Sequence, residues 1–340
     1  MIQRHAQDKT NNRDIYVSGS VAYDDIMDFP NHFKDYFHPE KLHQINVSFV
    51  VTDLAKHLGG IATNISYALR NTQTYYKSLH KGNAYTIFPV ASVGKDGDDL
   101  LNFFKKNNIN TTFVQKDEKL YTATGKVITD MNDNQIWGFY YGASALIPKH
   151  SFTKVENGKN DFWILSATHE KPFSTTLRYA INNKLPYMFD PGMTLTWIRD
   201  DLLKKGVLNA SYVVGNDYEI AMIEKRLGMT VAGMVEKGIN VITTLGEKGV
   251  RYDGQADVRT TLKVKSFKVR KVVDPTGAGD AWRGGFVGAL AACKPIEECL
   301  VMGNVMASFA VENVGTVEYQ TDEKKITERM RVVANTIKKS

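Results

Sequence analysis

Near the C-terminal end of the chain, an aspartate directly follows a glycine-rich turn. Residues of these types at this spacing could form a site for the transfer of a phosphoryl group. Residues 274–280 read DPTGAGD, and a long apolar run follows them. Small residues at a strand-to-helix junction let backbone N–H groups face one point, where the helix dipole adds partial positive charge. Asp280 would repel a phosphate, but it could accept the proton of an attacking hydroxyl group. The alternative is a tight turn in which Asp280 caps a helix.

Two segments upstream could hold a nucleotide and its metal ion. Asn216 and Glu219 follow a strand-like run and lie one helical turn apart, so their side chains face the same way. They could hold a hydrated Mg²⁺ beside a triphosphate, or Asn216 could cap a helix. Residues 243–250, TTLGEKGV, bracket a turn with glycines. A nucleotide could lie over this turn, and a plain hairpin explains it equally well.

The N-terminal part of the chain offers groups that suit a hydroxylated substrate. Residues 57–69, HLGGIATNISYAL, place two glycines before a helix and Asn64 near its start. Glycines let a ligand approach the backbone, and an amide offers both a donor and an acceptor. Residues 18–25, SGSVAYDD, follow the first strand-like run with Ser20 and Asp24. A carboxylate there could bind two adjacent hydroxyl groups, as on a ribose.

The elements that must position these groups alternate between strand-like and helix-like along most of the chain. Buried strand-like runs are expected at 14–21, 84–94, 161–167, 185–191, 210–216 and 240–246. Helices are expected after them, and the chain becomes helical from Ala278 onward. This alternation predicts an α/β fold with a central, mostly parallel sheet flanked by helices.

Two stretches interrupt this rhythm and predict a second, smaller sheet. Polar and apolar residues alternate in 23–29, 43–54, 122–130 and 135–142, and the turn MNDN joins the last two. Strands that expose one of their two faces to solvent are typical of an antiparallel sheet. We therefore predict a single domain over residues 1–340 with a small antiparallel lid from two insertions, at about 22–52 and 121–142.

The amino-acid composition argues against several classes of protein. The 340 residues are 43% hydrophobic, and 43 Lys and Arg against 37 Asp and Glu give a net charge of +6. This balance does not indicate nucleic-acid binding, and the basic segment 262–271 and the charged tail are interpreted as solvated faces. Cys293 and Cys299 are too few for a disulfide framework. With a polar N-terminus and no membrane-spanning run, the expected location is the cytoplasm.

Taken together, five ordered motifs resemble the ribokinase-like (PfkB) family of carbohydrate and nucleoside kinases. They are G-x-x-x-x-D at 19–24, G-G-x-x-x-N at 59–64, N-x-x-E at 216–219, T-x-G-x-x-G at 244–249 and D-x-T-G-A-G-D at 274–280. The resemblance covers roughly residues 14 to 320. Segments 29–54 and 274–286 are, within that family, similar to bacterial adenosine kinases of the mycobacterial type.

The resemblance implies a role for each motif. It implies ATP-dependent phosphorylation of the 5′-hydroxyl of adenosine, with Asp280 as base and the N–H groups of Gly277, Ala278 and Gly279 as anion hole. The residues implied to bind the nucleoside are Ser20, Asp24, Ser48, Gly60 and Asn64. Phe139 could stack on the base or could simply pack within the lid. Those implied for ATP and Mg²⁺ are Asn216, Glu219, Thr244, Gly246 and Gly249. Asp274 and Thr276, with backbone from Val311 to Gly315, resemble a K⁺ site, and the lid resembles a homodimer interface.

The chain departs from those adenosine kinases at residues that could touch the base. Gly192, Met193 and Trp197 follow the mid-chain Asp-Pro where polar side chains are usual, and Gly125 stands where an aromatic residue is expected. A kinase acting on another nucleoside or on a sugar therefore stays open. A non-catalytic nucleotide-binding regulator is the alternative from another class, and Asp280 behind the glycines argues against it. A dinucleotide-dependent oxidoreductase lacks its G-x-G-x-x-G motif.

Overall fold

A ten-stranded sheet forms the centre of the computed structural model, which describes residues 13–37, 46–79, 85–132, 134–148, 161–255 and 259–339. From one edge to the other the strands are β14 (Lys338–Lys339), β13 (Arg259–Val264), β12 (Val250–Gln255), β11 (Asn240–Thr244), β10 (Tyr212–Asn216), β9 (Tyr187–Asp190), β8 (Phe162–Ser166), β1 (Arg13–Ser18), β4 (Tyr85–Val93) and β5 (Val114–Lys116). The pairs from β11 to β5 are parallel, and the β11–β12, β12–β13 and β13–β14 pairs are antiparallel. The prediction of a mostly parallel sheet is confirmed.

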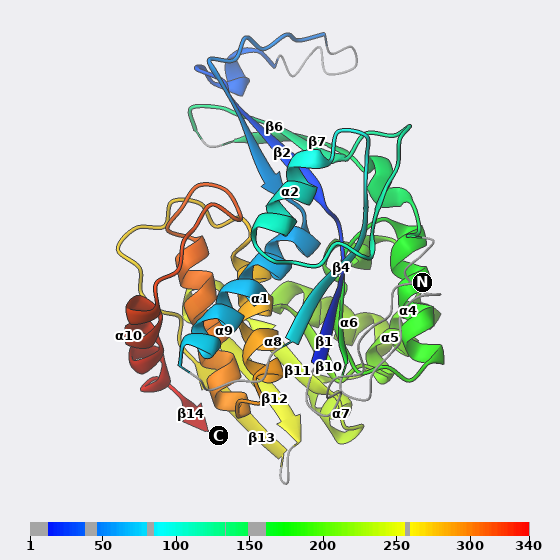
Figure 1. The fold of residues 1–340 in the computed structure, drawn as a ribbon, viewed down its shortest axis with the longest axis vertical. Helices are drawn as coiled ribbons and strands as arrows, with labels where there is room; N and C mark the ends of the chain where they lie inside the picture. The colour runs from blue at the N-terminus through cyan, green and yellow to red at the C-terminus, as the bar shows by residue number, and fades with distance from the viewer. Residues whose placement is uncertain are drawn as a thin grey trace.

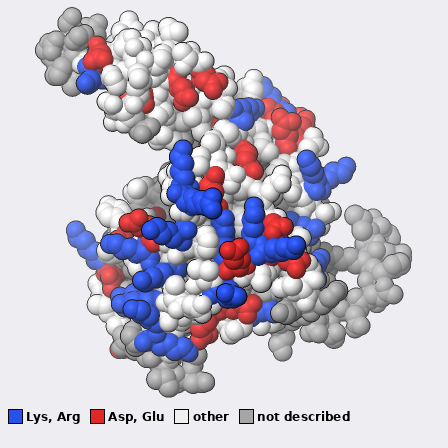
Figure 2. All heavy atoms as spheres, turned by 90° about the vertical axis from the view of Figure 1, so that its left-hand side faces the viewer, with Lys and Arg blue, Asp and Glu red and all other residues white. Residues whose placement is uncertain are grey.

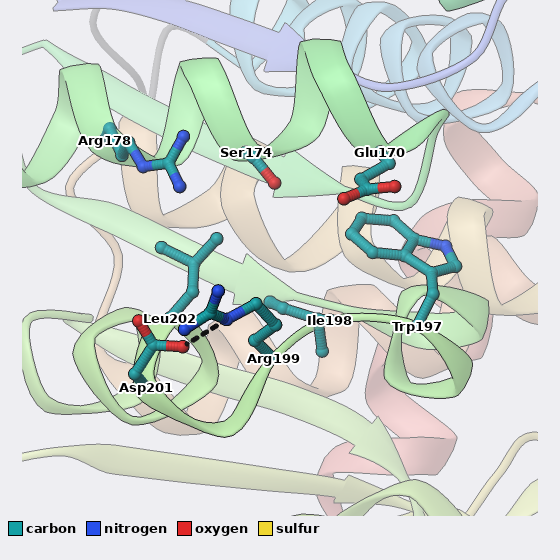
Figure 3. A pocket seen from close by; sticks show the side chains of 8 residues that line it. All are labelled: Glu170, Ser174, Arg178, Trp197, Ile198, Arg199, Asp201 and Leu202. Atoms are coloured by element: carbon teal, nitrogen blue, oxygen red, sulfur yellow. Dashed lines mark hydrogen bonds and ion pairs between the residues drawn. The ribbon is translucent and has the colours of Figure 1, made fainter.

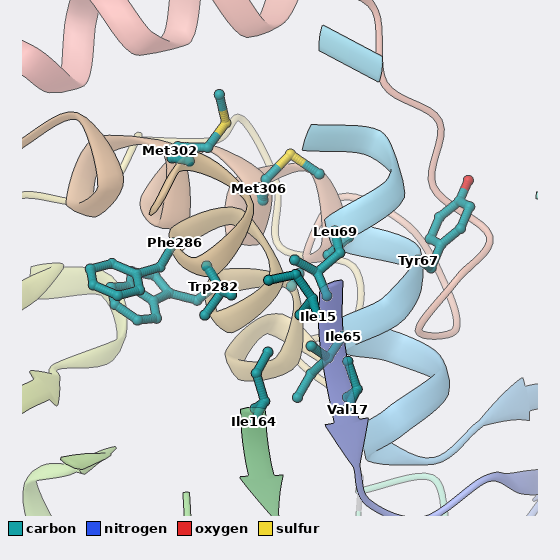
Figure 4. Packing of buried hydrophobic residues seen from close by; sticks show 14 of the residues in the cluster. Ile15, Val17, Ile65, Tyr67, Leu69, Ile164, Trp282, Phe286, Met302 and Met306 are labelled. Carbon is teal, nitrogen blue, oxygen red and sulfur yellow. The ribbon is translucent and has the colours of Figure 1, made fainter. Parts of the chain in front are cut away.

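Helices cover both faces of this sheet (Figure 1). Their bounds are α1 (Ile61–Ser78), α2 (Asp98–Lys106), α4 (Glu170–Asn182), α5 (Asp200–Leu208), α6 (Asp217–Leu227), α7 (Val231–Glu236), α8 (Ala278–Ala291), α9 (Ile296–Ala310) and α10 (Glu323–Ala334). Successive strand residues point to opposite faces, so Ile15 and Val17 pack with α1, α8 and α9, whereas Tyr16 packs with the core beneath α4 and α5. Figure 4 shows Trp282 and Phe286 of α8 packed within the first of these cores.

A four-stranded sheet stands at one end of the molecule (Figure 1). Its order is β3 (Asp53–Gly59), β2 (Ala22–Asp28), β6 (Ala123–Thr129) and β7 (Gln135–Tyr140). The outer pairs are antiparallel, and the central pair, β2 with β6, is parallel. The expected small sheet from two separate insertions is therefore present, and β2 leaves directly from the carboxyl end of β1.

One boundary of this small sheet differs from the prediction. Of the strand expected over 43–54, residues 43–45 lie outside the described part of the chain and residues 46–52 form no strand. The strand is found at Asp53–Gly59, so this part of the small sheet extends to Gly59 and not to residue 52. The ring of Phe49 packs against Phe29 and Phe33 at centroid distances of 4.8 and 5.1 Å. Aromatic packing therefore holds this segment, and the strand ladder begins only after it.

The basic segment 262–271 begins within strand β13, so some of its side chains are buried in the core. Leu262 and Val264 of β13 are buried, whereas Lys263 and Lys265 are exposed. Figure 2 shows lysine and arginine side chains interspersed with acidic ones over the face that carries α10. In the described part of the chain, every helix is too short or too polar to cross a bilayer.

Candidate active site

The Asp280 carboxylate is held by a residue from a distant helix. Asp280 lies in the first turn of α8, and its Oδ2 accepts a hydrogen bond from Asn64 Nδ2 of α1 at 2.8 Å. Thr316 Oγ1 donates to Asn64 Oδ1 at 2.7 Å and so orients the amide, because only its NH₂ group can then face Asp280. The structure thus joins the G-G-x-x-x-N and G-A-G-D motifs, which the sequence analysis did not connect to each other.

Burial makes Asp280 a stronger base than an exposed aspartate. Removal from water raises the pKa of Asp280 to about 6, and the Arg283 charge and the Asn64 hydrogen bond oppose this shift. A base must be deprotonated to act. Its function should therefore be present at neutral pH and should disappear as the pH falls through about 6. A base with a pKa this close to neutrality accepts a proton more readily than one near 4.

The residues predicted to form the anion hole lie at the beginning of α8. Gly277 precedes the helix with φ 75°, and a Cβ there would lie 2.9 Å from Cβ of Thr316, so only glycine fits. The N–H groups of a first helical turn have no partner within the helix and can face an anion. The Ala278 N–H, however, donates to Pro275 O at 3.3 Å, so this member of the predicted hole is engaged in a turn.

Asp24 projects from the small sheet toward the same region. It lies opposite His57 of β3 and Gly125 of β6, and the missing side chain at Gly125 makes room for its carboxylate: a Cβ there would lie 2.9 Å from Asp24 Oδ1. Burial raises the pKa of Asp24 to about 6, and His57 counteracts the shift. The Asp24 charge in turn contributes to the raised pKa of Asp280. The carboxylates of Asp24 and Asp280 are therefore close enough to interact electrostatically.

The aromatic surface expected at Gly125 comes from the neighbouring strand. A Cβ at Gly125 would lie 3.1 Å from Cζ3 of Trp137 and 3.6 Å from Cδ2 of Phe139, both on β7. Phe139 is 46% exposed and contacts the Tyr141 ring at 4.9 Å, so one of its faces is free to meet a ligand. The predicted stacking role of Phe139 stays a prediction, and Trp137 joins it as a residue that the sequence analysis missed.

Gly60 and Ser20 hold the first strand against α1. Gly60 has φ 89°, and a Cβ there would lie 2.6 Å from the backbone N of Ala22 and from Ser20 O. Ser20 Oγ accepts a hydrogen bond from the Ile61 N–H at 3.2 Å, which satisfies a first-turn donor of α1. Both residues therefore build the corner between β1, β2 and α1 from which Asp24 and Asn64 project.

Ser48, Met193 and Trp197 are not brought to this cluster. Ser48 is exposed in the segment before β3, and Met193 is 53% exposed in the turn after β9. Trp197 packs edge-on against Phe173 at 5.8 Å. It also lines a cavity of about 140 Å³ between α4 and the start of α5 (Figure 3), together with Glu170, Ser174, Arg178, Ile198, Arg199, Asp201 and Leu202. None of these lining residues belongs to the five motifs.

The N-x-x-E pair forms a capping box at the start of α6. The Glu219 N–H donates to Asn216 Oδ1, and the Asn216 N–H donates to Glu219 Oε2, both at 2.8 Å. The helix-capping alternative is therefore correct as local structure. A carboxylate has further lone pairs, so this cap leaves Glu219 able to bind a hydrated cation. Thr244 pairs with Asn216 in the sheet, which puts both motifs at neighbouring strand ends.

The glycines of T-x-G-x-x-G shape the hairpin between β11 and β12. Gly246 has φ 57° and Gly249 has φ 99°, and a Cβ at Gly249 would lie 2.0 Å from Val264 O. The Leu245 N–H donates to Gly249 O at 2.8 Å. The hairpin alternative for residues 243–250 is thus correct, and its turn lies at the strand end that carries Thr244.

Asp274 joins the two segments implied for a monovalent cation. Its Oδ1 accepts from the Thr276 N–H at 2.8 Å and its Oδ2 accepts from the Gly315 N–H at 3.1 Å. The Val273 N–H donates to Val311 O at 2.7 Å. Among the described residues, no group of three or more His, Cys, Asp or Glu side chains has the arrangement of a metal centre. Any cation here would need backbone or ligand oxygens as well.

The sequence analysis missed the partners that fix the central residues. Arg283, one turn after Gly279, is buried and paired with Asp190 at the end of β9. Arg283 is part of the quoted segment 274–286 and Asp190 begins the mid-chain Asp-Pro, so both were visible. Nothing in their spacing indicated that they would meet. His57 Nδ1 and Glu318 Oε1, 2.9 Å apart, similarly join the small sheet to the main body.

Comparison with known proteins supports one family. A model of the pfkB family of carbohydrate kinases matches residues 20–323. A nucleoside kinase of Methanocaldococcus jannaschii is 27% identical over 298 residues, covering 86% of this chain and 92% of that protein. A nucleoside kinase of Methanothermobacter thermautotrophicus is 27% identical over 311 residues, covering 89% and 91%. The structure of Burkholderia thailandensis nucleoside kinase in complex with inosine has a TM-score of 0.76 at 24% identity, covering 94% of this chain and 97% of that one.

Proposed function

The chain belongs to the pfkB family of carbohydrate kinases, and we propose that it phosphorylates the 5′-hydroxyl of adenosine with ATP, giving AMP and ADP. The observation that carries the proposal is the hydrogen bond between Asn64 Nδ2 and Asp280 Oδ2. It brings a residue suited to bind hydroxyl groups within 2.8 Å of a carboxylate that stands beside a helix N-terminus. A hydroxyl acceptor held by Asn64 would therefore lie beside both its base and the hole for the phosphoryl group.

Each group has a defined task in this reaction. Asp280 accepts the proton as the 5′-oxygen attacks the γ-phosphorus. The Gly277 and Gly279 N–H groups, with the dipole of α8, stabilise the negative charge on the transferred phosphoryl group. Asp24 and Asn64 hold the ribose hydroxyls, so the 5′-oxygen is fixed in the direction of attack.

The other substrate, ATP, would lie along the neighbouring ends of β10 and β11, beside Thr244, Gly246 and Gly249. Kinases of this family use ATP, typically with Mg²⁺, and the Glu219 carboxylate is positioned to hold a hydrated ion there. When bound, Mg²⁺ neutralises charge on the phosphates and orients them. Asp274 and Thr276 with the 311–315 backbone are proposed for K⁺, because Asp274 joins its own turn to Gly315 beside the start of α8.

The small sheet is proposed to be a lid over the nucleoside. It contributes Asp24 and carries Trp137 and Phe139 on β7 as surfaces for stacking on a base. Closure would exclude water, which otherwise competes with the nucleoside for the phosphoryl group. The choice of adenosine rests on the resemblance of segments 29–54 and 274–286 that the sequence analysis stated, whereas the similar proteins named above are nucleoside kinases. Another nucleoside fits the ribose-binding groups equally, and the B. thailandensis enzyme was crystallised with inosine.

The test is an acceptor panel. Purified protein with Mg-ATP and K⁺ is incubated with adenosine, inosine, guanosine, ribose or fructose, and ADP and the phosphorylated product are quantified. We expect AMP from adenosine at a kcat/KM at least tenfold above the other acceptors. Transfer to inosine or a sugar instead would keep the kinase and refute the adenosine assignment. ATP binding without transfer to any acceptor would favour the regulatory alternative.

The lid sheet is also expected to pair two copies of the chain. β7 is an edge strand, and Ile136, Trp137, Phe139 and Tyr140 on it are 38–50% exposed. An edge with this much apolar surface favours association. Sedimentation velocity should give a dimer, and Ile136→Lys should shift it toward monomer. A wild-type monomer at 50 µM, roughly the upper range of a working assay, would contradict this expectation.

A further inference from the structure

Arg283 is a buried cation directly behind the predicted anion hole. It lies in α8, one turn after Gly279, and is 7% exposed. Its NH1 group donates to Gly279 O at 2.9 Å, and its NH2 group donates to Asp190 Oδ1 at 2.5 Å. Its Nε is buried and has no hydrogen-bond partner among the described residues. Burying a guanidinium with an unpaired donor costs free energy, and here the charge-assisted hydrogen bond to the Asp190 carboxylate offsets this cost.

The partner of Arg283 is itself fixed to the central sheet. Asp190 is 4% exposed at the carboxyl end of β9, and its Oδ2 accepts a hydrogen bond from Ser166 Oγ of β8 at 2.7 Å. A chain of hydrogen bonds therefore runs from β8 through β9 to the backbone of the first turn of α8. This chain ties the N–H groups of that turn to the rigid sheet.

The charges that surround the Asp280 carboxylate come from three elements. Burial is the main cause that raises the pKa of Asp280; Arg283 of α8 lowers this pKa, whereas Asp190 of β9 and Asp24 of β2 raise it further. Asn64 of α1 donates the hydrogen bond described above. Glu219 of α6 lies close enough to Arg283 to stabilise its charge. Arg283 is thus the cation in a cluster of acids that would otherwise hold a proton on the base.

We propose that Arg283, anchored by Asp190, is a positioning residue for phosphoryl transfer. It fixes the first turn of α8 through Gly279 O, and it keeps Asp280 deprotonated among the neighbouring carboxylates. This inference rests on the proposed function. The buried ion pair of Arg283 and Asp190 lies outside the five motifs. In this proposal it sets both the geometry of the anion hole and the protonation state of Asp280.

The test uses pH–rate profiles of kcat/KM for the full-length enzyme from pH 5 to 9, with the preferred acceptor from the panel. Arg283→Met removes the positive charge, so the acid limb should move to higher pH by about one unit. Asp190→Asn removes a negative charge, so the limb should move the opposite way. Arg283→Lys keeps the charge but cannot reach both partners, so kcat should fall at least tenfold with the limb unmoved and KM nearly unchanged.

The matched control is Arg199→Met, which removes an arginine of an exposed ion pair with Asp201 and should leave the profile unchanged. A merely structural role would lower activity in every Arg283 and Asp190 variant without moving the limb. Folded Arg283→Met and Asp190→Asn variants, checked by circular dichroism, whose limbs stay at the wild-type position would overturn the inference. If Arg283→Met does not fold, Arg283→Lys decides, because a wild-type kcat in that variant would overturn the positioning role of Arg283. An inactive wild type would instead refute the proposed function.

Discussion

Asp280→Asn is expected to lower kcat by about 10²–10⁴-fold while the nucleoside KM stays nearly constant, because the variant loses only proton transfer. The asparagine oxygen can still accept the hydrogen bond from Asn64 Nδ2, so the binding groups keep their places. Coupled-assay kinetics at pH 8, roughly two units above the pKa of the base, would measure the loss.

The same variant has a second readout that separates chemistry from folding. Because burial raises the pKa of Asp280 to about 6, the folded state binds its proton more tightly than the unfolded state does. The charged carboxylate therefore destabilises the folded protein above pH 6, and less so as the pH falls through 6 toward 4. Asp280→Asn should thus melt at the same temperature as the wild type or higher at pH 8. Asp201→Asn, at an exposed position, is the control. More than a tenth of wild-type kcat in Asp280→Asn would exclude Asp280 as the base.

Gly60→Ala is expected to lower stability strongly, because the added Cβ would clash with the backbone at the corner between β1, β2 and α1. The added Cβ would lie 2.6 Å from Ala22 N and from Ser20 O, and the residue must keep φ 89°. Overpacking and left-handed strain together should reduce the free energy of unfolding by about 2–4 kcal/mol. The forced shift of β2 against α1 should also separate Asp24 from Asn64 and lower kcat/KM.

Gly228→Ala provides the matched control for this prediction. Gly228 also has a positive φ, 58°, but a Cβ added to it at the end of α6 would meet nothing within 4 Å. This variant should lose only the cost of the left-handed backbone, about 1 kcal/mol. Urea unfolding of both variants would compare them directly. Equal losses in the two would mean that the corner relaxes freely and that Gly60 is not needed for close packing.

Several features of the fold could be predicted from the sequence, because they depend on residues that are close together in the chain. Apolar runs that alternate with helix-like segments predicted β1, β4, β8, β9, β10 and β11 and their parallel arrangement. Parallel strands put their carboxyl ends on one edge, and the strand order in the structure makes Asn216 and Thr244 neighbours on it. The order of the five motifs carried the resemblance to the family. The position of β3 was wrong, because the packing of the Phe49 ring outweighed the strand pattern of its segment.

By itself, the sequence determined which residues could do chemistry and on which strand ends and helix starts they would stand. The tertiary structure alone decided which of them meet and in what state. Asp280 reaches Asn64, Arg283 reaches Asp190, and Trp137 and Phe139 cover Gly125 from another strand. Such contacts join segments far apart in the chain, and the pKa of a carboxylate depends on the water and charges that those segments exclude or supply. The spacing of residues along the chain therefore predicts neither these long-range contacts nor the pKa values that depend on them.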